Sequence, residues 1–183
     1  MAMTKEQHEE LFKGILETTR KIFGHDGHLV PVIHCIKENE TAIYLIAEMP
    51  DVNAKDQVEK LIVKLVDEGA EAIAFAAESW LLDAADQHKY EEHFKKYKSI
   101  EDNPDRMEVV MITYSTKRFE IMASAKIIRE NEEDPWGVSF SGDKKTVKLG
   151  EWDVYNSDGT KHKSEGRFAR FWEKARALHA AEN

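Results

Sequence analysis

Glu78 is the first residue whose type and position suggest chemistry, because it lies at the end of residues 70–80, the most apolar stretch of strand length. A carboxylate on an apolar strand must find a partner or change its pKa. Arg106 and Arg129 lie at the ends of segments that can neighbour it. A bridge to either arginine would make Glu78 part of the scaffold, whereas without one it becomes a candidate acid or base.

More polar side chains follow at the turn formed by residues 103–106. With Glu108, which follows the turn, they can gather two carboxylates and a guanidinium around Glu78, a set that can orient a water molecule or hold an anion. The candidate catalytic residues are Glu78, Arg106 and Glu108, and the candidate binding residues around them are Trp80, Asp105 and Arg129. The alternative is a structural turn in which Asp105 caps backbone N–H groups.

A metal site is a third hypothesis, because His25, His28, His34 and Cys35 stand close together in the sequence. The spacing of His25 and His28 suits a zinc site. His34 and Cys35, however, point to opposite faces of a strand, so we expect no metal. Phosphate-binding glycine loops, nucleophile elbows and the His-Glu-x-x-His motif are absent from the sequence, and we expect no cofactor.

The stretch that carries Glu78 has the two-residue alternation of a strand whose two sides pack differently. Small residues fall on one face and larger ones on the other: Ala72, Ala74 and Ala76 against Ile73, Phe75 and Ala77. Glu78 falls on the small-residue face. A helix at residues 54–68 precedes this strand, with Asp51 or Asn53 as its N-cap. This crossover predicts that strand 42–48 runs parallel to strand 71–80, if both belong to one sheet.

Further elements surround this unit. Thr4 and Gln7 predict a capping box for a first helix that ends at Gly24. Strands at 28–36 and 42–48 then form a hairpin, and Pro31 indicates that the first of them lies at an edge or begins late.

A second hairpin and shorter strands complete the predicted sheet. The later strands are expected at 107–114, 119–129, 136–141 and 146–155. Before them, residues 81–105 form a long loop or short helix, which is either a lid or partner-binding segment or a surface excursion with no role. We predict one α+β domain over residues 1–183, with a single mostly antiparallel sheet of five to seven strands, helices packed on it, and the order α-β-β-α-β-(α)-β-β-β-β-α.

The segment 164–180 predicts an amphipathic C-terminal helix that is locally basic. Its apolar face carries Phe168, Phe171, Trp172, Ala175 and Leu178. This helix either docks on the protein's own sheet or binds a partner, including a second copy of the chain. Phe168, Phe171 and Trp172 are therefore candidate binding residues.

Four short motifs resemble a group of uncharacterised conserved bacterial and phage proteins. They are residues 27–31, Glu78-Ser79-Trp80, the Pro-Asp-Arg-x-Glu run at 104–108, and Lys126-Ile127-Ile128-Arg129. In that group a strand ending in Glu-x-Trp precedes a Pro-Asp-Arg-x-Glu strand. The resemblance implies no activity, but it implies that Glu78, Trp80, Arg106 and Glu108 act as a set, which holds either a fold or a ligand.

Composition narrows the classes of function. The chain is 42% hydrophobic and 33% charged with a net charge of -9, which is typical of an ordered protein and disfavours direct nucleic-acid binding. A single cysteine, a polar N-terminus and no long apolar run lead us to expect a cytoplasmic protein without signal peptide or membrane span.

Three functional hypotheses remain. We favour a non-enzymatic protein that binds a macromolecular partner or forms a homodimer. The alternative is a metal-independent acid/base enzyme that uses Glu78, Arg106 and Glu108. A lesser alternative is an acidic phage-type inhibitor of a nucleic-acid-binding enzyme.

Overall fold

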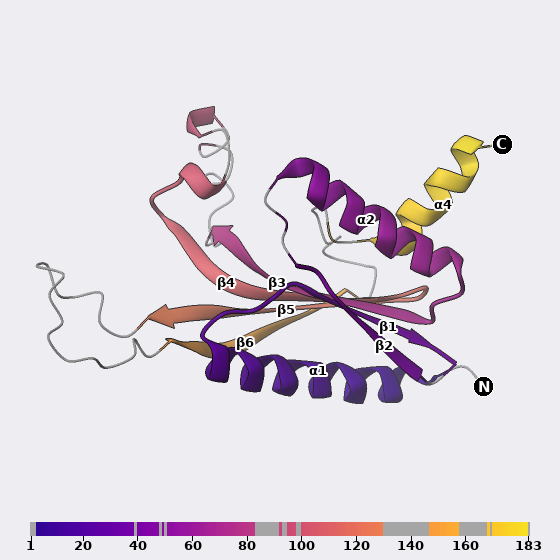
Figure 1. Cartoon of the computed structure of the whole chain (residues 1–183), viewed down its shortest axis with the longest axis horizontal. Helices are drawn as coiled ribbons and strands as arrows, with labels where there is room; N and C mark the ends of the chain where they lie inside the picture. The colour runs from indigo at the N-terminus through magenta and orange to yellow at the C-terminus, as the bar shows by residue number, and fades with distance from the viewer. Residues whose placement is uncertain are drawn as a thin grey trace, which may run out of the picture.

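One antiparallel sheet of six strands carries the helices of this protein (Figure 1). The computed structural model describes residues 3–38, 40–47, 49, 51–82, 92, 95–97, 100–129, 147–157, 168 and 170–182. The strands are β1 (Val32–Lys37), β2 (Glu40–Leu45), β3 (Ala72–Leu82), β4 (Arg106–Thr116), β5 (Glu120–Arg129) and β6 (Val147–Ser157), in the spatial order β2-β1-β3-β4-β5-β6. The helices are α1 (Lys5–Asp26), α2 (Val52–Asp67), α4 (Phe171–Glu182) and the short 3-10 turn η1 (Ile100–Asp102). The α+β prediction with a single antiparallel sheet is confirmed.

The helices divide between the two faces of the sheet. Figure 1 shows α1 alone beneath the sheet and α2 with α4 above it. Each face therefore has its own core: Phe12, Ile15 and Phe23 of α1 belong to one, and Ile62 of α2 with Phe171 of α4 belong to the other. We call these two sides of the sheet the α1 face and the α2 face.

Strand β3 lies in the interior of the sheet and has the two unlike faces that its alternation predicts. Ala72, Ala74 and Ala76 are fully buried on the α1 face. Ile73, Phe75 and Ala77 are buried on the α2 face. Because alanine projects only a methyl group, α1 and the large side chains of β4 can pack closely over this strand.

Strands β2 and β3 run parallel without touching, because β1 lies between them and pairs antiparallel with both. The predicted crossover is therefore correct in direction, but it spans one intervening strand. Helix α2 makes this connection across the α2 face. Its N-cap is Asp51, whose carboxylate accepts the N–H of Ala54 at 2.8 Å.

Helix α1 begins as predicted and ends later than predicted. Thr4 and Gln7 form the capping box. Gly24, the expected stop, lies inside the helix, and the prediction was wrong because Gly27 takes the left-handed conformation with φ 72°. The N–H of Gly27 bonds to the carbonyl of Phe23, whose side chain is fully buried and holds the last turn on the sheet.

The predicted segments agree with the structure to different extents. Strand β1 begins only after Pro31 and is an interior strand, so Pro31 marks a late start rather than an edge. The predicted second hairpin corresponds to β4 and β5. The predicted strand 136–141, most of the segment 81–105 and residues 164–167 lie outside the described residues. No helix in the described ranges is long and apolar enough to cross a membrane.

A polar pair is buried within the α1 face. His8 Nδ1 of α1 lies 2.6 Å from the hydroxyl oxygen of Tyr114 on β4. Burial lowers the pKa of His8 and raises the pKa of Tyr114. Both side chains therefore favour their neutral forms, which suits a hydrogen bond inside an apolar core.

Candidate functional site

Strand register gathers the predicted polar residues at one end of the sheet. Glu78 lies opposite Val110, and Trp80 lies opposite Glu108. The alternation that places Ala76 and Val110 on the α1 face also places Glu78, Trp80 and Glu108 there. We call this group, Glu78, Trp80, Arg106, Glu108 and Arg129, the polar end of the sheet.

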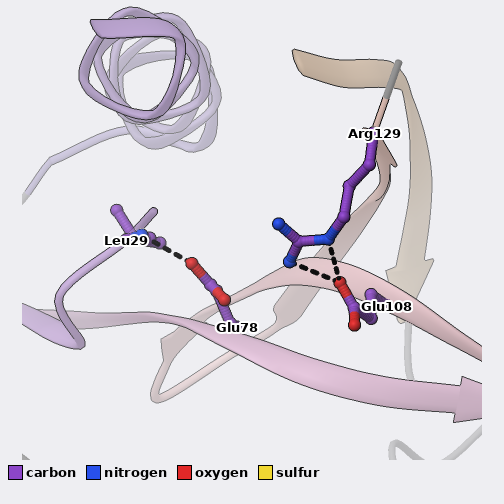
Figure 2. Close-up of polar contacts among 4 residues, drawn as sticks. All are labelled: Leu29, Glu78, Glu108 and Arg129. Atoms are coloured by element: carbon purple, nitrogen blue, oxygen red, sulfur yellow. Dashed lines mark hydrogen bonds and ion pairs between the residues drawn. The ribbon is translucent and has the colours of Figure 1, made fainter. Parts of the chain in front are cut away.

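Glu78 contacts a backbone amide and neither of the arginines proposed as its partners. Its Oε1 accepts the N–H of Leu29 at 2.6 Å (Figure 2). Leu29 is buried and belongs to the segment that connects α1 to β1. The carboxylate therefore fastens this connection to the end of β3, although Glu78 itself remains solvent-exposed.

Arg129, a predicted partner of Glu78, pairs instead with Glu108. Glu108 Oε2 accepts from Arg129 Nε at 2.9 Å and from Arg129 Nη2 at 2.6 Å, as Figure 2 shows. The two side chains are 37% and 34% exposed, for arginine and glutamate respectively. Pairs that are this accessible to water contribute little stability, so this bridge chiefly orients the two side chains across β4 and β5.

Arg106 stacks on an aromatic ring. Its guanidinium carbon lies 4.4 Å from the centroid of the Trp80 ring, the geometry of a cation–π contact. The two residues come from neighbouring strands, β4 and β3. The polar end therefore holds two separate side-chain contacts, Arg106–Trp80 and Glu108–Arg129, while Glu78 contacts the backbone of Leu29.

Asp105 lies in the turn before β4, and the capping there comes from a different residue. The side-chain oxygen of Asn103 accepts the N–H of Asp105 at 2.8 Å. Asn103 is buried and Asp105 is exposed. The turn is therefore stabilised by the asparagine, whose side chain supplies the cap proposed for Asp105.

The aromatic residues of the C-terminal segment serve the opposite face of the sheet. The Phe168 ring lies 4.3 Å from that of Phe75, and Phe171 is fully buried. Trp172 is partly buried in the same core. These residues dock α4 on its own protein and are separated from the polar end by the sheet, so the two predicted groups do not form one site.

The histidines and the cysteine are dispersed. His25 contacts Asp26 at 2.6 Å, whereas Cys35 is buried against α2. Within the ranges that the structure describes, no three His, Cys, Asp or Glu side chains gather into a group that could hold a metal ion.

Two surface cavities lie away from the polar end. One, of about 370 Å³, lies between the β1–β2 hairpin and α2 and includes Cys35, Thr41 and Leu65 in its lining. The other, of about 400 Å³, lies between α2 and α4 and includes Val63 and Leu178. The apolar residues of these strands and helices predict buried faces. In the folded protein, parts of those faces remain exposed and line the two cavities.

The exposed strand β2 is the feature that sequence reasoning missed. All six of its residues are exposed, including Ile43 at 60% and Leu45 at 73%. An alternation such as that of Thr41, Ile43 and Leu45 ordinarily predicts a half-buried strand. Here the side chains on both faces of the strand are exposed, and among the described strands only β1 pairs with it.

No family model, curated protein or solved structure matches the chain. The resemblance to the bacterial and phage group therefore stays a prediction, and the function must be argued from the geometry of the chain itself.

Replacing Glu78 with alanine is expected to lower the free energy of unfolding by about 1 kcal/mol. The reason is that the N–H of buried Leu29 loses its acceptor. Urea denaturation of the purified chain measures this change. Glu78→Gln is the matched control, because its amide oxygen can still accept the bond and most of the loss should disappear. Equal losses in both variants would contradict the assignment of Glu78 to this anchor.

Proposed function

We propose that the protein is a non-enzymatic interaction protein, which binds a macromolecular partner or itself by adding a strand to the free edge of β2. The observation that carries this proposal is the exposure of Ile43, Tyr44 and Leu45 on an edge strand. Exposed apolar side chains on a strand edge are the features by which one chain pairs with another.

The backbone of β2 supports the same proposal. The N–H of Ile46 bonds to the carbonyl of Pro31, which fixes these two residues as a hydrogen-bonded pair. Hydrogen-bonded and non-bonded pairs alternate along an antiparallel ladder. Tyr44 and Ala42 therefore direct their N–H and C=O groups toward β1, and Thr41, Ile43 and Leu45 direct theirs outward.

The two edges of the sheet differ in how they resist pairing. Strand β6 exposes Val154 and Tyr155, but it also carries Lys148, Glu151 and Asp153, and its register with β5 shifts after Ala125. Charges and irregular register are the devices that protect an edge strand. Strand β2 carries one charged residue, Glu40, and pairs with β1 in an unbroken register.

The other two hypotheses rest on weaker features. A general base needs a carboxylate free to accept a proton from a substrate, whereas Glu78 and Glu108 both accept hydrogen bonds of 2.6 Å. A nucleic-acid mimic needs a continuous acidic surface. Acidic side chains on α1 and α2 instead alternate with lysines, as in the Lys5–Glu9, Glu10–Lys13 and Lys64–Glu68 pairs.

Affinity capture with the full tagged chain tests the proposal. The immobilised chain is incubated with an untagged second copy and, in a separate experiment, with a lysate of the source cells. Mass spectrometry then measures the mass of any protein that is bound in a stoichiometric amount. Ile43→Pro removes an outward N–H without touching the ladder to β1, and it should abolish binding. Ile43→Ala keeps that N–H and loses only part of the apolar side chain, so it should weaken binding far less than Ile43→Pro. Capture that Ile43→Pro leaves unchanged, or no captured protein at all, would overturn the proposal.

A further inference from the structure

We infer that the partner of the β2 edge is β2 of a second copy, paired antiparallel about a two-fold axis at Ile43. This inference rests on the proposed function and names its partner. The first argument is the backbone. Two copies can form backbone hydrogen bonds only through N–H and C=O groups that point away from β1. Thr41, Ile43 and Leu45 are the residues of β2 that carry such groups.

One register uses all of these groups at once. It places Ile43 opposite Ile43 of the second copy, and Thr41 opposite Leu45 of the second copy. Each such pair exchanges two N–H···O bonds, so the contact adds about six hydrogen bonds. The two sheets become one continuous sheet, and the axis makes the contact isologous.

The side chains of β2 fit this register. On the α1 face the exposed Ile43 and Leu45 side chains meet Ile43 and Thr41 of the second copy. On the α2 face the register places Tyr44 opposite Ala42 of the second copy, so that a large residue meets a small one on both sides of the axis. Removing these apolar side chains from water stabilises the pairing.

Charge does not oppose a second copy at β2. The chain carries a net charge of -9, which opposes most contacts between identical surfaces. Strand β2 has a single charged residue, Glu40, and the register places it opposite Ile46 of the second copy rather than opposite another carboxylate. The strand is thus a surface where two acidic chains can meet without direct repulsion.

Sedimentation equilibrium of the full chain tests this inference. The wild-type chain should have twice the 21.1 kDa mass of one copy at micromolar concentration. Ile43→Lys should weaken the dimer at least tenfold. Val154→Lys is the matched control, because Val154 is a 48% exposed β-branched residue on the α1 face of the other edge strand, and it should leave the dimer intact.

Disulfide trapping tests the register itself. In a Cys35→Ser background, Ile43→Cys should form a covalent dimer on mild oxidation, since hydrogen-bonded pairs have Cα atoms about 5.5 Å apart, within the range that a disulfide spans. Thr41→Cys should not, because its counterpart is displaced by several residues along the strand. Circular dichroism confirms that each variant is folded.

The outcomes separate the inference from the proposed function. A wild-type monomer that still captures another protein through an Ile43-dependent edge overturns the inference and leaves the proposed function standing. A dimer that Ile43→Lys does not weaken, or that Thr41→Cys traps as well as Ile43→Cys, overturns the inference. A monomer that captures nothing overturns both.

Discussion

Replacing Phe171 with alanine is expected to lower the free energy of unfolding by about 3–5 kcal/mol, the usual cost of emptying a large buried aromatic site. Phe171 is fully buried among α2, β1 and β3, in the core that Ile33, Ile62 and Ile73 share. It is also the first residue of α4. The loss should therefore combine a cavity with weaker docking of the whole helix, and urea denaturation followed by circular dichroism measures it.

Leu178→Ala is the matched control on the same helix. Leu178 is 50% exposed, so its truncation should change the free energy of unfolding by less than about 1 kcal/mol. The Lys174–Glu59 ion pair, 2.6 Å long, also ties α4 to α2, but it should not replace the buried ring. Similar small losses for both variants would show that α4 contributes little to the core.

The sequence was sufficient where local chemistry decides the structure. Thr4 with Gln7 marks the start of the first helix, and Asp51 or Asn53 the start of the second, because a side-chain oxygen must satisfy free N–H groups within the first turn. The alternation in β3 revealed two unlike faces because every second side chain points the same way. The fold class followed from the order of such elements.

Helix ends and strand neighbours depended on contacts between distant residues. Gly24 and Gly27 are equally able to end a helix, and only the left-handed conformation of Gly27 shows that α1 continues past Gly24. The insertion of β1 between β2 and β3 follows from pairing across the sheet. Neither feature is visible in a local pattern.

The polar end was predicted as a group, but its pairings were not. Arginine side chains are long enough to reach several carboxylates. The observed register gives Arg129 to Glu108 and leaves Glu78 to the N–H of Leu29. A backbone partner cannot be read from residue types, so the contact between Glu78 and the N–H of Leu29 required the structure.

The position of β2 at an edge was equally hidden in the sequence. Its alternating residues predict a strand, and only the strand order shows that one side of it has no neighbour among the strands that the structure describes. The other edge strand, β6, carries several charged side chains, whereas β2 carries only Glu40. This difference supports β2 as the edge that pairs with another chain. The absence of protecting charges matters only once β2 is known to be an edge.

Replacing Ala74 with leucine is the second change expected to have a large effect, because it tests why β3 carries small residues. Ala74 is fully buried on the α1 face, opposite His34 on one side and Tyr114 on the other. The Tyr114 ring is itself fully buried and meets Phe12 of α1 edge-on, with centroids 5.7 Å apart.

A leucine side chain at position 74 must displace the Tyr114 ring or lift α1 from the sheet, and such overpacking costs about 1–3 kcal/mol. Thermal and urea denaturation measure the loss. Ala177→Leu is the control, because Ala177 is exposed on α4 and a leucine there should stay within about 0.5 kcal/mol of the wild type. A fully stable Ala74→Leu chain would mean that the space above β3 is not closely packed. In that case the alanines of this strand would need an explanation other than the close approach of α1.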